Sequence, residues 1–104
     1  MVIREWRGRV NRERSAQYPA HFRAHVVPEL RKVPGFLSAV LSERTEGNVV
    51  EYLVLTRWTS LSAVQAFAGQ NPQKAVVEPG AIAALSDYDR EVRHYEVIEA
   101  VSSD

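Results

Sequence analysis

The chain has 104 residues, of which 45% are hydrophobic, and its 13 Lys and Arg balance 13 Asp and Glu. This length and composition predict a single domain over residues 1–104, with its one core within about 2–99. The absence of cysteine excludes disulfides, thiolate catalysis and cysteine-ligated metals, and it fits a cytoplasmic protein. The sequence shows no apolar run of the length that a signal peptide or a membrane span needs, so we expect neither a leader nor a membrane partner.

The charge is unevenly distributed along the chain. Residues 1–34 carry eight Lys and Arg against three Asp and Glu, a net +5, whereas residues 35–104 carry five against ten, a net −5. A basic arm can bind nucleic acid, but here the arginines are interleaved with glutamates over a predicted strand and the start of a helix. We interpret them as charges that neutralise the acidic half or a partner subunit, and we expect no nucleic-acid partner.

The first third of the chain predicts a strand and then a helix. Residues 2–10 alternate between two faces, with Arg4 and Trp6 on the same face as the apolar ends, as is typical of a strand. From about residue 12 to residue 32 the apolar residues recur every four positions, which predicts an amphipathic helix. Pro19 suits a first turn, whereas Pro28 is expected to bend or end the helix.

The next elements are a hairpin and a second helix. Val33-Pro34-Gly35 is a breaker, after which residues 36–44 and 49–58 are rich in β-forming residues and predict two strands joined at 45–48. Thr59 or Ser60 can cap a helix that ends near Gly69. Residues 71–85 predict short helical turns, and residues 91–99 alternate as a last strand.

The order strand, helix, strand, strand, helix, strand predicts an α+β fold of the ferredoxin-like βαββαβ type, in which an antiparallel sheet carries helices on one face. The strand over residues 49–58 is apolar on both faces, so the other face of the sheet also needs a cover. We therefore expect a homodimer that forms through the sheet faces.

Four short segments carry a family resemblance over essentially the whole chain. They are IREWRG at 3–8, VPGF at 33–36, LTRWTSL at 55–61 and RHYEV at 93–97. Together with the order of elements, they resemble the antibiotic-biosynthesis-monooxygenase-like family of dimeric α/β-barrel proteins. The resemblance implies a ligand cavity between helices and sheet within each subunit. Its leading functional implication is a cofactor-independent monooxygenase for a small aromatic or quinol-type molecule; the alternative is a non-catalytic homodimer that binds a small molecule or is purely structural.

The resemblance also sets expectations at single positions. Trp58 matches an aromatic residue near the cavity of the polyketide oxygenases, whereas the asparagine expected at position 54 is Val54. The haem-degrading members use an asparagine, a tryptophan and an iron-binding histidine where this chain has Arg7, Phe67 and Val77. We therefore expect no haem degradation and no cofactor.

Two histidines are the candidate catalytic residues. His25 adjoins the apolar stripe of the first helix, and we predict that it faces the cavity as a general base; the alternative is a histidine on the flank of the helix. His94 shares a strand face with Glu96, whose carboxylate can orient the imidazole, or else it is a structural hydrogen-bonding group. His21 lies four residues before His25, but a metal needs a third ligand, so we expect no metal site.

Aromatic residues are the candidate ligand-binding surfaces, with packing in the core as the alternative. They are Tyr18, Phe22, Tyr52, Trp58 and Phe67. The sequence has no phosphate-binding loop, nucleophile elbow or dinucleotide fingerprint. Proton abstraction from a substrate whose carbanion reacts with dioxygen fits this inventory best, because it requires only a base, a polar anchor and a dry pocket.

Overall fold

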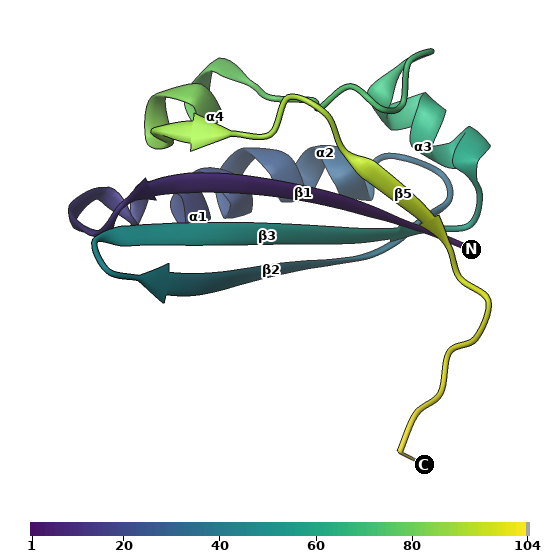
Figure 1. The fold of residues 1–104 in the computed structure, drawn as a ribbon. Coiled ribbons are helices and arrows are strands. Elements are labelled where there is room, and N and C mark those ends of the chain that lie inside the picture. Colours follow the sequence, from purple (N-terminus) through teal and green to yellow (C-terminus); the bar gives the residue numbers. More distant parts are fainter. Residues whose placement is uncertain (104) are drawn as a thin grey trace.

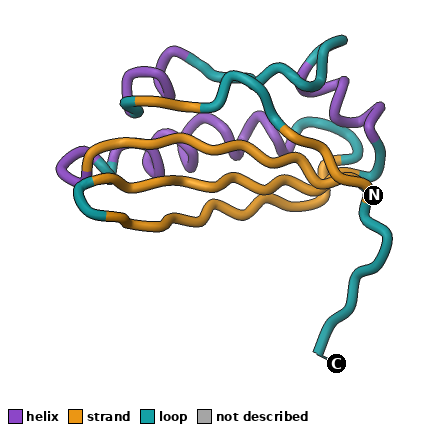
Figure 2. The backbone as a smooth tube through the Cα atoms, in the orientation of Figure 1, coloured by secondary structure: helices purple, strands orange, loops and turns teal. Residues whose placement is uncertain are grey.

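A computed structural model describes residues 1–103; Asp104, which the predicted domain includes, lies outside the described residues. Its centre is a five-stranded antiparallel sheet in the order β2-β3-β1-β4, with β5 also paired to β1 (Figures 1 and 2). The long strands are β1 (Val2–Asn11), β2 (Phe36–Glu46) and β3 (Val49–Trp58). Their alternating, β-branched sequences predict them at nearly these bounds.

Register fixes which side chains share a face. Arg4 of β1 lies opposite Thr56 of β3, and Trp6 lies opposite Val54. Directly opposed residues point to the same side of a sheet, so these four side chains all face the helices. The helix-facing side chains of β3 are buried from Val50 to Trp58, whereas the alternate residues are only half-buried.

The predicted first helix is one helical path with a wide turn in the middle. It consists of α1 (Gln17–His21), the π-helical turn η2 (Phe22–Val26) and α2 (Val27–Arg31). The amide of Val27 bonds to the carbonyl of Phe22, five residues back. Pro28 follows at once; it has no N–H, and its ring would clash with the carbonyl four residues earlier in a regular α-helix. The bend expected at Pro28 is therefore taken up by a π turn on its N-terminal side.

Two glycines with positive φ lie at the ends of elements in the middle of the chain. Gly47, with φ of +59°, lies in the turn between β2 and β3, so the loop expected at 45–48 is reduced to its last two residues. Gly35, with φ of +92°, ends the helical path, and its carbonyl accepts a 2.8 Å hydrogen bond from the amide of Thr59. The helix α3 (Leu61–Ala68) then begins at Ser60, whose hydroxyl accepts from the amide of Ala63 at 3.2 Å.

The last quarter of the chain returns to the free edge of β1. It contains an irregular stretch, the helix α4 (Pro79–Ala84) and the strands β4 (Asp87–Tyr88) and β5 (Arg93–Glu96). The last strand is shorter than expected, and β4 is an additional two-residue strand opposite Gly8 and Arg9. The path from β3 through α3 and α4 to β5 completes the ferredoxin-like α+β fold, as predicted.

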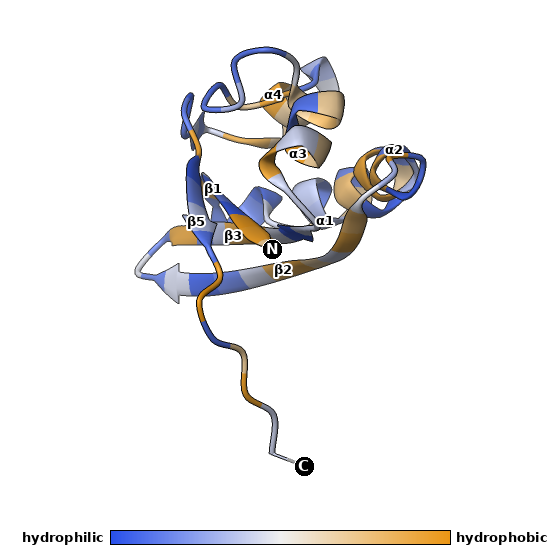
Figure 3. Cartoon of the chain, turned by 90° about the vertical axis from the view of Figure 1, so that its right-hand side faces the viewer, coloured by the Kyte–Doolittle hydropathy of each residue, from blue (hydrophilic) through white to orange (hydrophobic). Residues whose placement is uncertain are grey.

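The helices lie on one side of the sheet (Figure 3). Two core clusters fill this layer; one is centred on Tyr52 and Tyr18, the other on Trp58 and Leu30. The opposite face carries no helix from residues 1–103, and it presents Val40 and Tyr95, 53% and 48% exposed, beside half-buried Leu55. Within the same residues, no helix is long and apolar enough to cross a bilayer.

Candidate functional site

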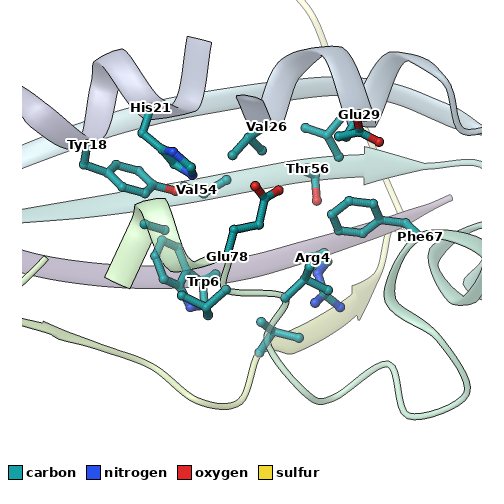
Figure 4. Close-up of a pocket in the computed structure, with 15 residues that line it drawn as sticks. Arg4, Trp6, Tyr18, His21, Val26, Glu29, Val54, Thr56, Phe67 and Glu78 are labelled. Carbon is teal, nitrogen blue, oxygen red and sulfur yellow. The ribbon is translucent and has the colours of Figure 1, made fainter. Parts of the chain in front are cut away.

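A cavity lies between the sheet and the helices, at the junction of the two core clusters. Its volume is about 70 Å³, counted as the space that the centre of a water molecule can occupy. Strands β1 and β3 form the floor, the path from α1 to α2 forms one wall, and Phe67 of α3 with the chain from Val76 to Ala81 forms the other. Figure 4 shows Arg4 and Phe67 at one end, Tyr18 and His21 at the other, and Glu78 projecting between them.

Arg4 is the cation of this cavity. It is only 6% exposed, since it occupies a helix-facing position of β1 among apolar residues. One terminal nitrogen, Nη1, donates to the carbonyl of Pro72 at 2.6 Å, and Nη2 donates to the carbonyl of Lys74 at 3.1 Å. Burial lowers the pKa of Arg4 to about 10, so the guanidinium still carries its charge at neutral pH.

His94 of β5 is the third partner of Arg4. Its Nε2 lies 3.0 Å from Nη1 of Arg4 and accepts a hydrogen bond as a neutral imidazole. Burial and then the charge of Arg4 lower the pKa of His94. The predicted pairing with Glu96 is not formed, because the Glu96 carboxylate instead lies 3.3 Å from the N-terminal amine at the surface.

The opposite end of the cavity holds a tyrosine and a histidine, Tyr18 and His21. Burial, with a contribution from the charge of Glu78, raises the pKa of Tyr18, so its hydroxyl stays protonated as a donor. Nε2 of His21 is buried and has no hydrogen-bond partner among the described residues. The imidazole also lies against α4, where a Cβ on Gly80 would stand 2.8 Å from Nδ1 of His21.

The aromatic residues predicted to bind a ligand fall into two groups. Tyr18 and Phe67 line the cavity. Phe22, Tyr52 and Trp58 lie in the core beneath it; the Tyr52 hydroxyl donates to the carbonyl of Ser15, and Nε1 of Trp58 donates to Oγ1 of Thr56 at 2.8 Å.

His25 is exposed and lies outside the cavity lining, contrary to its predicted orientation. The side chains of this helical path that line the cavity are Tyr18, His21, Val26, Glu29 and Leu30. The histidine of this helix that reaches the cavity is therefore His21, which the sequence singled out only as half of a metal pair.

Sequence reasoning also missed Arg4 and Glu78. For Arg4 a signal existed, since an arginine on the core face of an alternating strand must find buried partners. Glu78 precedes a short helix in an irregular stretch, and nothing local distinguishes it from a surface glutamate.

Comparison with known proteins agrees with this fold. The sequence profile of the family described as antibiotic biosynthesis monooxygenase matches residues 1–79. Among curated proteins, none matches the chain.

Several solved structures share the fold. A monooxygenase from the gene ActVA-Orf6 of Streptomyces coelicolor, in complex with nanaomycin D, has a TM-score of 0.68 and 18% identity over 99% of this chain and 92% of its own. SnoaB, a cofactor-independent oxygenase from Streptomyces nogalater, has a TM-score of 0.61 and 17% identity over 96% of each chain. The haem degrader MhuD from Mycobacterium tuberculosis, with two haems bound, has a TM-score of 0.64 and 21% identity over 98% of this chain and all of its own. Since the family profile covers three quarters of the sequence, the chain belongs to the antibiotic biosynthesis monooxygenase family.

Proposed function

We propose that the protein is a cofactor-independent monooxygenase whose cavity takes a small aromatic or quinol-type molecule. The observation that carries the proposal is the buried, unpartnered Nε2 of His21 at one end of a mostly apolar cavity, with the Arg4 cation at the other. A buried, unpaired imidazole nitrogen at the wall of a mostly apolar cavity is placed to accept a proton from a bound molecule.

The reaction needs no electrons from the protein. A base removes a proton from a hydroxyl of a quinol, or from the activated CH₂ group of an anthrone, and a ring carbon of the resulting anion bonds to one atom of dioxygen. The O–O bond of the peroxide then breaks; one oxygen remains on that carbon as a carbonyl, and the other leaves as water with two protons that the substrate has lost. The substrate supplies all the electrons, so the protein has only to deprotonate it, orient it and exclude water.

The described residues divide these tasks. His21 is the proposed base, and the protonated Tyr18 hydroxyl is a hydrogen-bond donor to the peroxide oxygen. Arg4 at the far end stabilises the negative charge that spreads over the ring system when the proton leaves. The carboxylate of Glu78 is a second candidate base in the same cavity, so the experiment also includes its removal.

Size limits the substrate. An engineered apolar cavity of about 150 Å³ accommodates benzene, and this cavity has about 70 Å³. A single ring therefore exceeds the space inside the cavity, and a bound ring must either extend towards its open side or displace part of its wall. Single-ring quinols fit this requirement more easily than fused polyketides.

Haem does not fit this cavity as it stands. The volume of the cavity is far below that of a porphyrin. Val77, at the position where the resemblance expects the iron ligand, has no ligating atom. Arg7, at the position of the expected asparagine, lies on the opposite face of the sheet, where it pairs with Glu5.

The test compares two histidines of one helix. Oxygen uptake is measured with single-ring quinols and with an anthrone, for the wild type, His21→Gln, Glu78→Gln and His25→Gln. Loss of a general base lowers the rate by about 10²–10⁴-fold, and we expect that loss for His21→Gln only. His25→Gln should retain wild-type activity because its side chain is at the surface. If His25→Gln abolished oxygen uptake and His21→Gln did not, His25 would be the base. Oxygen uptake unaffected by His21→Gln would remove His21 from the mechanism.

A non-catalytic binding protein is the second candidate. Val54 and Val77 supply apolar walls where the oxygenase and haem-degrading relatives are expected to carry polar or ligating groups. Saturable binding of aromatic compounds without any oxygen uptake would favour this function.

We also propose that a second copy covers the open face of the sheet. Val40, Tyr95 and Leu55 form an apolar surface there, and half-buried Arg57 has an unpartnered Nε. Self-pairing of two such faces removes this surface from water. Sedimentation equilibrium should give about twice 11.7 kDa, and a stable monomer would refute the proposal.

A further inference from the structure

We propose that Arg4 is a binding group for a carboxylate, so that the cavity selects single-ring hydroxyaromatic acids over their neutral analogues. This inference deepens the proposed function by naming a substrate class for the same cavity. It stands on the surroundings of Arg4, and its test requires no turnover.

The first argument is the missing counterion. The other arginines of β1 pair with carboxylates: Arg7 with Glu5, and Arg9 with Asp87 and Asp89 at 2.9 and 2.7 Å. Arg4 has no carboxylate within 4 Å among the described residues, although it is the most buried of the three. A buried charge is costly unless it is paired. The carbonyls of Pro72 and Lys74 and the neutral His94 supply dipoles, but they supply no opposite charge.

The second argument is the number of donors. A guanidinium has five N–H groups, and the three contacts of Arg4 use both of Nη1 and one of Nη2. The Nε–H and the second Nη2–H have no acceptor among residues 1–103. Because Arg4 forms part of the cavity wall, a carboxylate inside the cavity can accept these donors as a forked pair.

The third argument concerns the surrounding charges. Glu78 and Glu29 both line the cavity without forming ion pairs with Arg4, and both oppose an incoming anion. Coulomb energy falls with distance, so direct contact with Arg4 outweighs repulsion from a carboxylate farther away. His94, the other titratable group that contacts Arg4, is held neutral and adds no repulsion.

The remaining walls define the rest of the ligand. The guanidinium lies 5.9 Å from the centre of the Phe67 ring, and Trp6 and Val54 continue the apolar floor. These surfaces suit an aromatic ring attached to the carboxylate. At the far end, the Tyr18 hydroxyl and Nε2 of His21 suit a ring hydroxyl.

The probes are 4-hydroxybenzoate and 4-hydroxybenzamide, which share ring and hydroxyl and differ in charge. Binding is measured at pH 7 by chemical-shift titration of the full-length protein. The acid should bind at least about tenfold more tightly than the amide, because a charge-assisted pair is substantially stronger than a neutral hydrogen bond. Equal affinities, or no saturable binding of either compound, would overturn the proposal.

Substitutions test whether Arg4 causes the preference for the acid over the amide. Arg4→Gln should remove the preference for the acid while the amide binds as before. Arg31→Gln, which deletes an exposed arginine outside the cavity lining, should keep the full preference. If Arg4→Gln does not fold, the test rests on Arg4→Lys and on the affinities of the wild type for the acid and for the amide. Arg4→Lys should lose most of the preference for the acid, since lysine lacks the planar fork. Full retention of that preference would count against the forked contact.

The binding and turnover results separate the two proposals. Acid-selective binding without oxygen uptake would keep the Arg4 site and refute the oxygenase. Oxygen uptake with neutral quinols, together with equal binding of acid and amide, would keep the oxygenase and refute the Arg4 site.

Discussion

Gly35, at the exit of the first helical path, gives the sharpest test of the fold. A Cβ at this position would stand 2.5 Å from Cβ of Ala63 and 2.7 Å from Oγ1 of Thr59, and the backbone has φ of +92°. The left-handed backbone costs an alanine about 1–2 kcal/mol, and the overlap adds about 1–3 kcal/mol. Gly35→Ala should therefore lower the free energy of unfolding by about 2–5 kcal/mol, a large part of the total for a domain of this size.

Gly47 provides the matched control. It also has positive φ, +59°, but no atom lies within 4 Å of a Cβ placed there. Gly47→Ala thus carries only the backbone cost, and the gain from a stiffer unfolded chain is common to both variants. The difference in unfolding free energy between Gly35→Ala and Gly47→Ala therefore measures the steric overlap with α3.

Urea unfolding at one protein concentration, followed by tryptophan fluorescence, measures both variants. Adding Ala63→Gly to Gly35→Ala removes part of the overlap, so the double-mutant cycle should show a favourable coupling of about 1 kcal/mol or more. If Gly35→Ala were no less stable than Gly47→Ala, the close packing between this exit and α3 would be refuted.

Three further substitutions test other parts of the structure. The lowered pKa of His94 means that the unfolded chain takes up a proton first as the pH falls below about 6.5, so the folded state loses stability there; His94→Gln should show a shallower decline in unfolding free energy from pH 7 to 5, and equal slopes would contradict this. Leu55→Glu places a charge on the open sheet face and should convert the proposed dimer to a monomer of 11.7 kDa by sedimentation; an unchanged mass would contradict an interface on this face. Trp58→Phe loses the 2.8 Å bond to Thr56 and leaves a void at a fully buried position, so denaturant unfolding should show a loss of about 1–3 kcal/mol, and a change near zero would be inconsistent with this packing.

The sequence predicts most of the fold because its strongest signals are local. Alternation over residues 2–10 and 49–58 predicts β1 and β3 within a residue, and Ser60 is a helix cap by its side-chain chemistry alone. The short strand β4 leaves no such signal, because two residues pair with β1 only after α4 has brought them there. The π turn likewise depends on how Pro28 is accommodated, which a helical repeat does not encode.

The candidate site was less predictable from the sequence, because it is assembled from residues far apart in the chain. Tyr18 and Phe67 reach the cavity from helices whose periodicity is visible. Arg4 gains its role from carbonyls of an irregular segment about seventy residues later. On the first helical path the structure brings His21 to the cavity and leaves His25 exposed, so the local pattern selects the helix that lines the cavity but a histidine outside its lining.

Gly80 of α4 lies close to the imidazole of His21. Glycine at position 80 lets α4 approach this side of the ring, because a Cβ there would stand 2.8 Å from both Nδ1 and Cε1 of His21. Gly80 belongs to the segment that also forms one wall of the cavity. A residue without a side chain therefore sets how closely the proposed base and the wall of its own cavity approach each other.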